Sequence, residues 1–333
     1  MIFSKNKSIR VLVTGGSGFI GSSFIRFGLA HISWCQRIVN LDLLTYAANP
    51  ENLRSIECDE RYRFVQGDIC DEALVESICC EEKIDAIVHF AAESHVDRSI
   101  VDPTAFYQTN VGGTLALLEV VRKRKGIHFH HISTDEVYGS LDFKEEPFSE
   151  KSPYRPNSPY AASKAAADHF VRAYGKTYEI SCTLSHCSNN YGPYQHVEKF
   201  IPRVITSCIQ RKQIPIYGTG HNVRDWIFVD DHAAAVWTIL ERGCPGEIYD
   251  IGGGCEMGNV ALAHAIIEQI AKSREEDPKT LYALLEHIDD RPGHDLRYAL
   301  SSEKIRCELQ WKPQYDFVNG LKKTVKWYLG HQI

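Results

Sequence analysis

A glycine-rich segment near the start of the sequence constrains the fold of this chain more than any other feature. Gly15, Gly18 and Gly21 follow an apolar run at Val11–Thr14 and open a helical pattern. Glycines at this spacing let the backbone approach a pyrophosphate, and the helix N-terminus adds partial positive charge. Asp42 ends the next predicted strand, where a carboxylate binds a ribose 2′-hydroxyl and repels a 2′-phosphate. The segment predicts a dinucleotide-binding unit that prefers NAD to NADP.

Apolar runs alternate with helical patterns through the first half of the chain. The predicted buried strands are Val11–Thr14, Ile38–Leu41, Tyr62–Val65, Ala86–Phe90, Phe129–Ser133 and Ser181–Ser185. The predicted helices include Asp71–Cys80, Pro103–Lys123 and a long helix that begins near Tyr160. This alternation predicts an α/β fold with a doubly wound, Rossmann-like parallel sheet.

Prolines and glycines divide the second half into shorter elements. Its predicted strands are Ile214–Tyr217, Asp225–Val229, Glu247–Ile251 and Leu281–Ile288. Its predicted helices are Asp231–Glu241, Asn259–Lys272 and Phe317–Leu329. We therefore predict that residues 1–188 mainly form the NAD-binding domain. Residues 189–333 mainly form a smaller C-terminal substrate-binding lobe, from which some late segments return to the first domain.

Composition narrows the range of partners. The net charge of −6 disfavours a broad basic surface for nucleic acid. Every apolar run is shorter than the ~20 residues that cross a membrane, and Met1–Arg10 shows no signal-peptide pattern. We expect a cytoplasmic protein with neither a membrane nor a nucleic-acid partner.

Cysteine and histidine residues do not show the spacing of a metal site. The sequence has 11 cysteines but no C-x-x-C pair, so we interpret them as reduced, mostly core-filling thiols. In the run His128 to His131, strand alternation places His128 and His130 on one face and His131 on the other. No third ligand is evident nearby, so a structural strand is favoured and no metal is expected.

Two pairs of polar residues in the middle of the chain point to its chemistry. Tyr160 and Lys164 are four residues apart and share one face of a helix. There the ammonium can lower the pKa of the phenol, so that the phenolate can take a proton from a sugar hydroxyl. Asp135 and Glu136 follow a predicted strand and add a general acid and a general base. An exposed acidic turn is the structural alternative, but the position of the pair favours an enzyme that oxidises, eliminates and reduces.

These residues, in this order, resemble the extended short-chain dehydrogenase/reductase superfamily, and they are still more similar to the dTDP-glucose 4,6-dehydratase family within it. The resemblance covers nearly the whole chain. Its most specific motifs are Thr134 to Glu136, Ser188 to Pro193 and Asp290 to Asp295. All the matching segments are Thr14–Gly21, Leu41–Ala47, Ala91–Ser99, Ser133–Gly139, Tyr160–Lys164, Cys187–Gln195, Arg224–Trp226, Ile251–Asn259 and Arg291–Tyr298.

The resemblance implies a hydro-lyase that dehydrates dTDP-glucose to its 4-keto-6-deoxy form with tightly bound NAD. The implied catalytic residues are Thr134, Asp135, Glu136, Tyr160 and Lys164. The implied cofactor residues, besides Tyr160, Lys164 and the three glycines, are Phe19, Ile20, Asp42, Leu43, Leu44, Thr45, Asp68, Ile69, Ala91, Ala92, Glu93, Ser94, Thr109 and Asn190. The implied sugar-nucleotide residues, besides Thr134, are His95, Asn189, Lys199, Phe200, Pro215, Ile216, Tyr217, Arg224, Asn259, Asp290, Arg291, Pro292, Gly293 and His294.

Several positions depart from the pattern that the resemblance leads us to expect. They are Leu43 for a lysine, His186 for an arginine, Val197 for a proline, Phe200 for a leucine and Cys255 for an asparagine. None of them removes an implied catalytic group. The resemblance also implies a homodimer that pairs through the helices at 103–123 and 160–178.

Three other functions remain open at this stage. A sugar-nucleotide 4-epimerase uses the same Tyr/Lys pair and NAD but usually has small hydroxyl residues in place of Asp135 and Glu136. A 4,6-dehydratase could act on UDP-glucose instead of dTDP-glucose. A dinucleotide-sensing regulator without catalysis would have a broken Tyr/Lys pair, whereas Tyr160 and Lys164 are both present.

Overall fold

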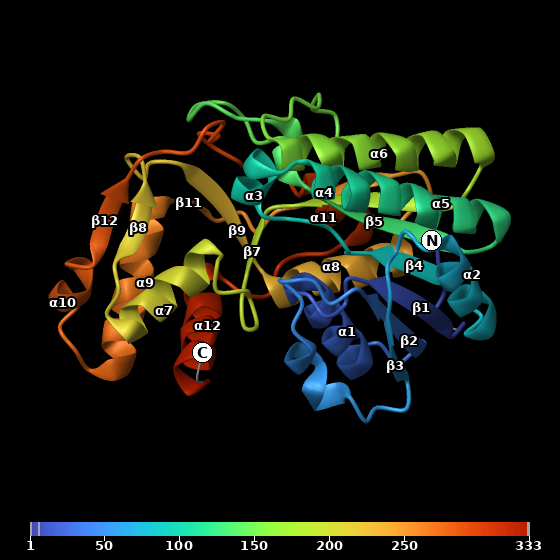
Figure 1. The fold of residues 1–333 in the computed structure, drawn as a ribbon, viewed down its shortest axis with the longest axis horizontal. Helices are drawn as coiled ribbons and strands as arrows, with labels where there is room; N and C mark the ends of the chain where they lie inside the picture. The colour runs from blue at the N-terminus through green and yellow to red at the C-terminus, as the bar shows by residue number, and fades with distance from the viewer. Residues whose placement is uncertain (1, 6, 332–333) are drawn as a thin grey trace.

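A parallel sheet organises the larger part of the molecule (Figure 1), whose computed structural model describes residues 2–5 and 7–331. Within this part of the chain the sheet has seven strands in the order β10-β6-β5-β4-β1-β2-β3. Their bounds are β1 Ile9–Thr14, β2 Cys35–Asp42, β3 Tyr62–Gln66, β4 Ala86–His89, β5 His128–Thr134, β6 Cys182–Cys187 and β10 Ile248–Ile251. The order 3-2-1-4-5-6 is that of a doubly wound dinucleotide-binding sheet, so the predicted fold class is confirmed.

Apolar residues face both sides of this sheet because its strands are covered by helices above and below. Val11 and Val13 of β1 enter one core, whereas Leu12 between them enters the opposite core. A strand alternates its side chains between two faces, so a continuous apolar run places hydrophobic groups in both layers. This explains why the buried strands of the first half were recognisable from the sequence.

The two helical layers come from different parts of the chain. One layer comprises α1 (Phe19–His31), α8 (Val229–Arg242) and α11 (Glu303–Leu309). The other comprises α2 (Glu72–Glu81), α5 (Thr114–Lys123) and α6 (Pro159–Tyr178), with α5 and α6 side by side in Figure 1. Phe24 of α1 stacks on Trp237 of α8 with ring centroids 4.5 Å apart. Late segments of the chain therefore pack on the sheet formed mostly by the first half, and β10 adds a strand to that sheet.

A smaller lobe lies beside the carboxyl edge of the sheet (Figure 1). Its strands are β7 (Asn189–Tyr191), β9 (Val223–Phe228) and β11 (Glu256–Gly258) in one sheet, and β8 (Ile214–Tyr217) paired with β12 (Leu285–Ile288) in another. Its helices are α7 (Phe200–Gln210), α9 (Asn259–Arg274), α10 (Lys279–Tyr282) and α12 (Phe317–Gly330). These elements enclose a separate hydrophobic core, which gives the lobe its own packing unit.

The structure corrects two predicted elements. Residues 281–288 do not form one strand, because Pro278 starts the short helix α10 and only Leu285–Ile288 is extended. The helix predicted from Pro103 is divided into α4 (Thr104–Phe106), the π-helix η2 (Tyr107–Gly113) and α5.

Several short elements were not predicted. They are the 3₁₀ segments η1 (Pro50–Ile56) and η3 (Asp135–Tyr138), the strands β7 and β11, and the helices α3 (Val96–Val101), α7 and α11. Helix α7 contains Pro202, but this residue lies in the first turn, where a proline costs no intrahelical hydrogen bond.

Candidate active site

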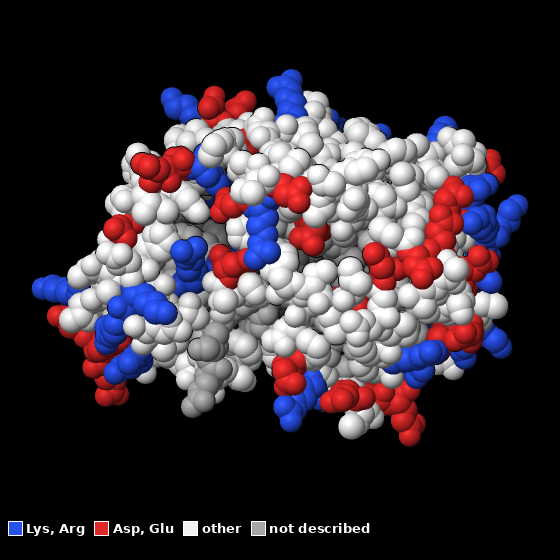
Figure 2. All heavy atoms as spheres, in the orientation of Figure 1, with Lys and Arg blue, Asp and Glu red and all other residues white. Residues whose placement is uncertain are grey.

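A cleft of about 320 Å³ opens at the carboxyl ends of the sheet strands, facing the smaller lobe. Figure 2 shows this face hollowed near its centre, with acidic and basic side chains interspersed at the rim. The predicted cofactor residues that line the cleft are Gly15, Gly18, Phe19, Ile20, Gly21, Asp42, Leu43, Thr45, Asp68, Ile69, Ala91, Ala92, Glu93, Ser94, Thr109, Tyr160, Lys164 and Asn190. Thr134, Asp135, Glu136, Asn189 and Lys199 line it as well.

The glycine turn brings backbone atoms close together at the floor of the cleft. Gly15 has φ +69°, and a Cβ there would meet the Ala91 backbone at 2.6 Å. Gly18 caps α1 without any side-chain hydrogen bond, so the first amides of the helix face the cleft free of a capping side chain. A glycine-only approach and an uncapped helix N-terminus fit the pyrophosphate of a dinucleotide.

Asp42 ends β2 with its carboxylate held by backbone amides. Its Oδ2 accepts from the N–H of Ser17 at 2.9 Å, and its Oδ1 accepts from the N–H of Leu44 at 2.8 Å. Leu44, the one predicted cofactor residue that does not line the cleft, has φ +60° and so turns the chain back toward this carboxylate. Burial raises the pKa of Asp42, and the two amide hydrogen bonds oppose this shift. The fixed carboxylate fits a ribose hydroxyl.

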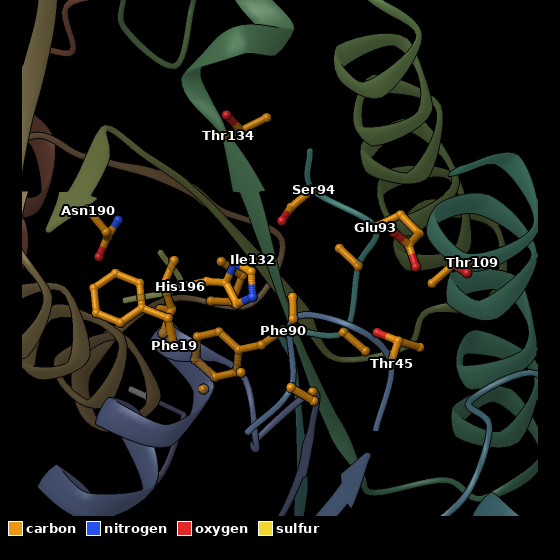
Figure 3. Close-up of a pocket in the computed structure, with 18 of the residues that line it drawn as sticks. Phe19, Thr45, Phe90, Glu93, Ser94, Thr109, Ile132, Thr134, Asn190 and His196 are labelled. Carbon is orange, nitrogen blue, oxygen red and sulfur yellow. The ribbon is translucent and has the colours of Figure 1, made fainter. Parts of the chain in front are cut away.

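Figure 3 shows Phe19 and Asn190 on one side of the cleft, Glu93 and Thr109 on the other, and Thr134 at the end of β5. Asn110, to which the sequence analysis gave no role, holds the backbone of Glu93 in place on its side of the cleft. Its Oδ1 accepts from the Glu93 N–H at 2.9 Å, and its Nδ2 donates to the Glu93 carbonyl at 3.0 Å and to Ser163 Oγ at 2.8 Å. Asn110 lies in η2, where the wider turn of a π-helix re-aims side chains.

Lys164 lies directly beneath the cleft and is 4% exposed. Its Nζ donates to the Ile132 carbonyl at 2.7 Å and lies 3.3 Å from His131 Nε2. Burial lowers the pKa of Lys164 to about 8. The ammonium is therefore placed by β5 as well as by its own helix α6.

Tyr160 differs from the expectation that its phenol would have a lowered pKa. Burial raises the pKa of Tyr160, the negative charge of Glu136 raises it further, and a hydrogen bond with Thr134 lowers it. Asp135 and Cys187 raise it as well, and the Lys164 ammonium is directed at the Ile132 carbonyl and His131. The pKa of Tyr160 is thus raised in the structure, whereas the sequence analysis expected it to be lowered.

Asp135 and Glu136 are adjacent, but their surroundings differ. Burial raises the pKa of Asp135 well above its usual value, and Glu136 and Asp225 raise it further. The pKa of Glu136 is also raised by burial, but three cations oppose the shift, namely Arg291, Arg224 and Lys199. Two carboxyls in unequal fields can serve as acid and base in one site.

The predicted sugar-nucleotide residues beyond the cleft fall into two groups. Arg224 and Arg291 act electrostatically on Glu136, and Arg291 also pairs with Asp97 at 3.0 Å. Tyr217 donates to Asp97 and meets the ring of His294 edge-on. Asp290 accepts from the Arg291 amide and contacts His294 at 2.6 Å, and Pro292 and Gly293 lie in the turn between them. These residues gather on the lobe side of α3.

Other predicted residues lie in different surroundings. Phe200 packs against the core of the lobe, and Ile216 is buried within it. Pro215 precedes it in β8, and Asn259 begins α9, where its amide donates to the Asn222 carbonyl. His95 contacts Glu198 at 3.5 Å. The cleft as described does not include these five side chains.

The cleft also contains residues that sequence reasoning missed. They include Phe90, Ile132, Ser133, Cys187, Ser188, Gln195, His196 and Glu198. Buried His232 lies behind the wall, where its Nδ1 meets Asn190 Oδ1 at 2.9 Å. Gln195 donates to the Asn190 carbonyl. For Cys187, Gln195, His196 and Glu198 the available signal was their proximity in sequence to the motif Ser188 to Pro193, whereas His232 lies in α8, which is distant in sequence.

Among residues 2–5 and 7–331, no helix is both long and apolar enough to span a membrane. The cysteines of this part of the chain are all free thiols, and no group of three or more His, Cys, Asp or Glu side chains gathers there in a way that could hold a metal ion. The histidines of β5 alternate as predicted, because His128 and His130 contact Thr183 of β6 whereas His131 faces Lys164.

Among the departures, Leu43 lines the cleft with 49% of its surface exposed, and Val197 is also exposed. Cys255 meets Asp225 through its backbone amide, so its side chain makes no part of that contact. His186 lies behind the cleft. These departures therefore leave the cleft residues described above in place.

The strand order, the glycine turn before α1 and the Tyr160/Lys164 pair at the carboxyl edge together define an extended short-chain dehydrogenase/reductase. Comparisons with known proteins agree with this class and narrow it. The family model for GDP-mannose 4,6 dehydratase matches residues 12–324. The dTDP-glucose 4,6-dehydratase of Haemophilus influenzae is 48% identical over 333 residues, which cover 96% of this chain and 98% of the relative. The enzyme of that name from Neisseria gonorrhoeae is 46% identical, with 97% and 96% covered.

Solved structures give the same picture. DesIV, a dTDP-glucose 4,6-dehydratase from Streptomyces venezuelae with NAD and TYD bound, has a TM-score of 0.90 and 46% identity, with 97% of each chain covered. The UDP-glucose 4-epimerase of Thermotoga maritima, solved with UDP-glucose, has a TM-score of 0.85 but only 26% identity, with 97% of this chain and 99% of that chain covered. The chain belongs to the dTDP-glucose 4,6-dehydratase family, which confirms the resemblance found in the sequence.

Proposed function

We propose that this chain is an NAD-dependent hydro-lyase that converts dTDP-glucose to dTDP-4-keto-6-deoxyglucose. Family membership supports the reaction. The main structural observation in favour of this reaction is the acid pair. Asp135 and Glu136 act electrostatically on Tyr160, and their different surroundings suit one carboxyl to act as the acid and the other as the base. A 4-epimerase has no step that needs both carboxyls.

NAD fits the residues of the cleft. Gly15 allows the close backbone approach, Gly18 leaves the start of α1 uncapped, and Asp42 presents a fixed carboxylate. When bound, NAD supplies a hydride acceptor for C4 of the sugar and returns the hydride to C6.

The residues of the chain then divide the proton transfers among them. Tyr160 takes the proton of the C4 hydroxyl, and Thr134, its hydrogen-bond partner, bonds the C4 oxygen. A cation near the phenol is needed for this step, because the chain alone raises the pKa of Tyr160. Lys164, whose Nζ donates to the Ile132 carbonyl, supplies one positive charge from the chain, and NAD would add a second one when bound.

The elimination follows at C5 and C6. The positive charges of Arg224, Arg291 and Lys199 favour the ionised form of Glu136. This carboxylate removes the C5 proton, which the 4-ketone has made more acidic. Asp135, kept protonated by burial, gives its proton to the departing C6 hydroxyl, and water leaves. The cofactor ends as it began, so no external reductant is consumed.

Product analysis tests this function directly. Purified protein is incubated with dTDP-glucose and, separately, with UDP-glucose, and the products are identified by mass. We expect loss of one water from the dTDP sugar at the higher rate. An isomer of unchanged mass would support epimerisation, and faster dehydration of the UDP sugar would replace the proposed substrate. No change in either sugar would favour a cofactor-sensing protein.

We further propose that the enzyme works in the cytoplasm as a homodimer that pairs through α5 and α6. Large apolar side chains on and near these helices support this face, including Tyr107, Phe170 and Tyr178, which are 66%, 39% and 49% exposed. Exposed apolar surface is typical of a protein interface. Residues 1–188 would mainly hold NAD and residues 189–333 mainly the sugar nucleotide.

A further inference from the structure

A buried polar cluster lies behind the Tyr160/Lys164 pair and takes no direct part in the proposed reaction. We call it the Asp168 cluster, and it consists of His131, Ser133, Asp168, His186 and Asp250. Their side chains are between 0% and 3% exposed. They come from β5, α6, β6 and β10, so the cluster joins the sheet to the helix that carries Tyr160 and Lys164.

His186 stands at the centre of the cluster, between two carboxylates. Its Nδ1 lies 2.8 Å from Asp250 Oδ1, and its Nε2 lies 3.3 Å from Asp168 Oδ2. A carboxylate only accepts hydrogen bonds, and a neutral imidazole donates from one nitrogen only. Both ring nitrogens can donate only if His186 is an imidazolium cation. The Tyr154 hydroxyl, 2.8 Å from Nε2, agrees with this state because it also has Asp168 as a hydrogen-bond partner to which it can donate.

The charge balance of the cluster agrees with this protonation state. Burial would lower the pKa of His186, but its contacts with Asp168 and Asp250 raise it to about 9. Burial also lowers the pKa of His131, to about 4, so this ring is neutral. One cation between two anions, with the Lys164 ammonium beside them, leaves a compensated set of buried charges.

Asp168 connects His186 to the catalytic lysine. The Asp168 charge raises the pKa of Lys164, whose Nζ lies 3.3 Å from His131 Nε2. Asp168 Oδ1 faces the same nitrogen at 3.4 Å but has no hydrogen-bond partner among the described residues. Its Oδ2 accepts from Ser133 Oγ at 2.8 Å. Ser133 directly precedes Thr134 at the end of β5, just before the acid pair. Asp168 therefore acts on Lys164 and also binds the end of the strand that precedes Asp135 and Glu136.

We propose that His186 is a positioning residue for the reaction, because its charge lies against Asp168, the carboxylate that acts on Lys164, and thereby sets both the placement and the protonation equilibrium of Lys164. With His186 charged, Asp168 is partly neutralised and attracts the ammonium less. Without that charge, Asp168 would act on Lys164 unshared and hold it more firmly in the protonated form.

The other side chains that face His186 carry no positive charge that could replace that of its imidazolium. Tyr138 from η3 lies 2.9 Å from Nδ1 and donates to Asp250, and Tyr154 lies 2.8 Å from Nε2. Burial raises the pKa of both phenols, so they remain neutral. Glu150 accepts from the Asp250 amide. His131, Lys164 and the two aspartates complete the titratable groups around the ring.

The first test compares two variants of the NAD-loaded enzyme. His186→Asn removes the charge, and His186→Arg retains it. We expect His186→Asn to lower kcat by about tenfold or more, since small misplacements in a site cost this much, with little change in KM. Its alkaline limit of kcat/KM, which we assign to Lys164, should move upward by at least about half a pH unit. His186→Arg should keep the original limit.

The second test does not depend on His186→Asn being folded. Asp250→Asn keeps the shape of the side chain and removes one of the two anions that hold His186. Imidazole NMR signals of isotope-labelled histidine should show His186 charged at pH 7 in the unmodified protein and titrating at lower pH in this variant. The alkaline limit of kcat/KM should then move upward while the titration of His186 moves downward, an opposition that a purely structural role does not produce.

Two results would overturn the inference. One is a neutral His186 at pH 7 in the unmodified protein, and the other is an unchanged alkaline limit in the folded variants. The inference rests on the proposed function because it treats Lys164 as catalytic. Different measurements nevertheless test the proposed function and the role of His186. Product mass from the unmodified enzyme tests the function, whereas the NMR titration of His186 is independent of the product formed.

Discussion

Asp135 and Glu136 show how neighbouring residues of similar chemistry acquire different roles. Asp135 is 2% exposed, and its Oδ2 has no hydrogen-bond partner among the described residues. Glu136 lies within the field of three basic side chains. The sequence predicted an acid and a base here, but the assignment of each role depends on Arg224, Arg291 and Lys199, which are brought in from distant segments.

Replacing the two carboxyls should therefore block different steps. Glu136→Gln should permit oxidation at C4 but stop proton removal at C5, so a reduced-nicotinamide absorbance persists and solvent deuterium does not enter C5. Asp135→Asn should spare C5 exchange better than loss of water. Each variant should lose about two orders of magnitude or more in turnover. Near-original turnover by both would remove the dehydratase assignment and favour the epimerase.

Cofactor preference should depend on one carboxylate. Asp42→Ala removes the partner of a ribose hydroxyl and the group that repels a 2′-phosphate, so the affinities for NAD and NADP should become more similar. Calorimetric titration of cofactor-free protein with each dinucleotide measures the change. Glu60→Ala is a matched control, since it removes one exposed acidic side chain outside the cleft. Equal affinities in the unmodified protein would contradict the role given to Asp42.

At the scale of elements, sequence patterns predicted the long buried strands best. Continuous apolar runs such as that of β1 reflect burial on both faces, which the periodicity of a sequence records directly. Short elements whose geometry depends on neighbours were missed. Nothing in Tyr107–Gly113 marks a π-helix, because the contacts of Asn110 with Glu93 and Ser163 exist only after α6 has packed.

The π-helix η2 should matter for cofactor binding through Asn110. Asn110→Ala would leave the Glu93 backbone without both of its partners, at a cost of about 1–3 kcal/mol for buried groups. We expect a weaker affinity for NAD, by about tenfold, and a lower melting temperature. Gln108→Ala lies in the same segment with its side chain exposed and serves as the control. Equal NAD affinity in both variants would show that η2 does not shape the cofactor site.

At the scale of the molecule, the outer face of α6 should decide the oligomeric state. Phe170→Asp places a charge in the proposed interface and should shift sedimentation from dimer toward monomer. Val318→Asp, on α12 of the other lobe, introduces the same charge at a position that is 70% exposed and should leave the dimer intact. If the unmodified protein sediments as a monomer at all concentrations, the proposed pairing through α5 and α6 is excluded.

The position of β10 has a consequence for how the protein is made. β6 pairs with β10 in parallel, with His186 opposite Asp250, although the two strands are separated by much of the smaller lobe. During synthesis the N-terminal part of a chain emerges first. The growing sheet therefore presents an open edge at β6, a template for unwanted strand addition, until residue 251 leaves the ribosome. Only then does His186 gain its second carboxylate, so maturation of the groups behind Lys164 is timed to a late stage of translation.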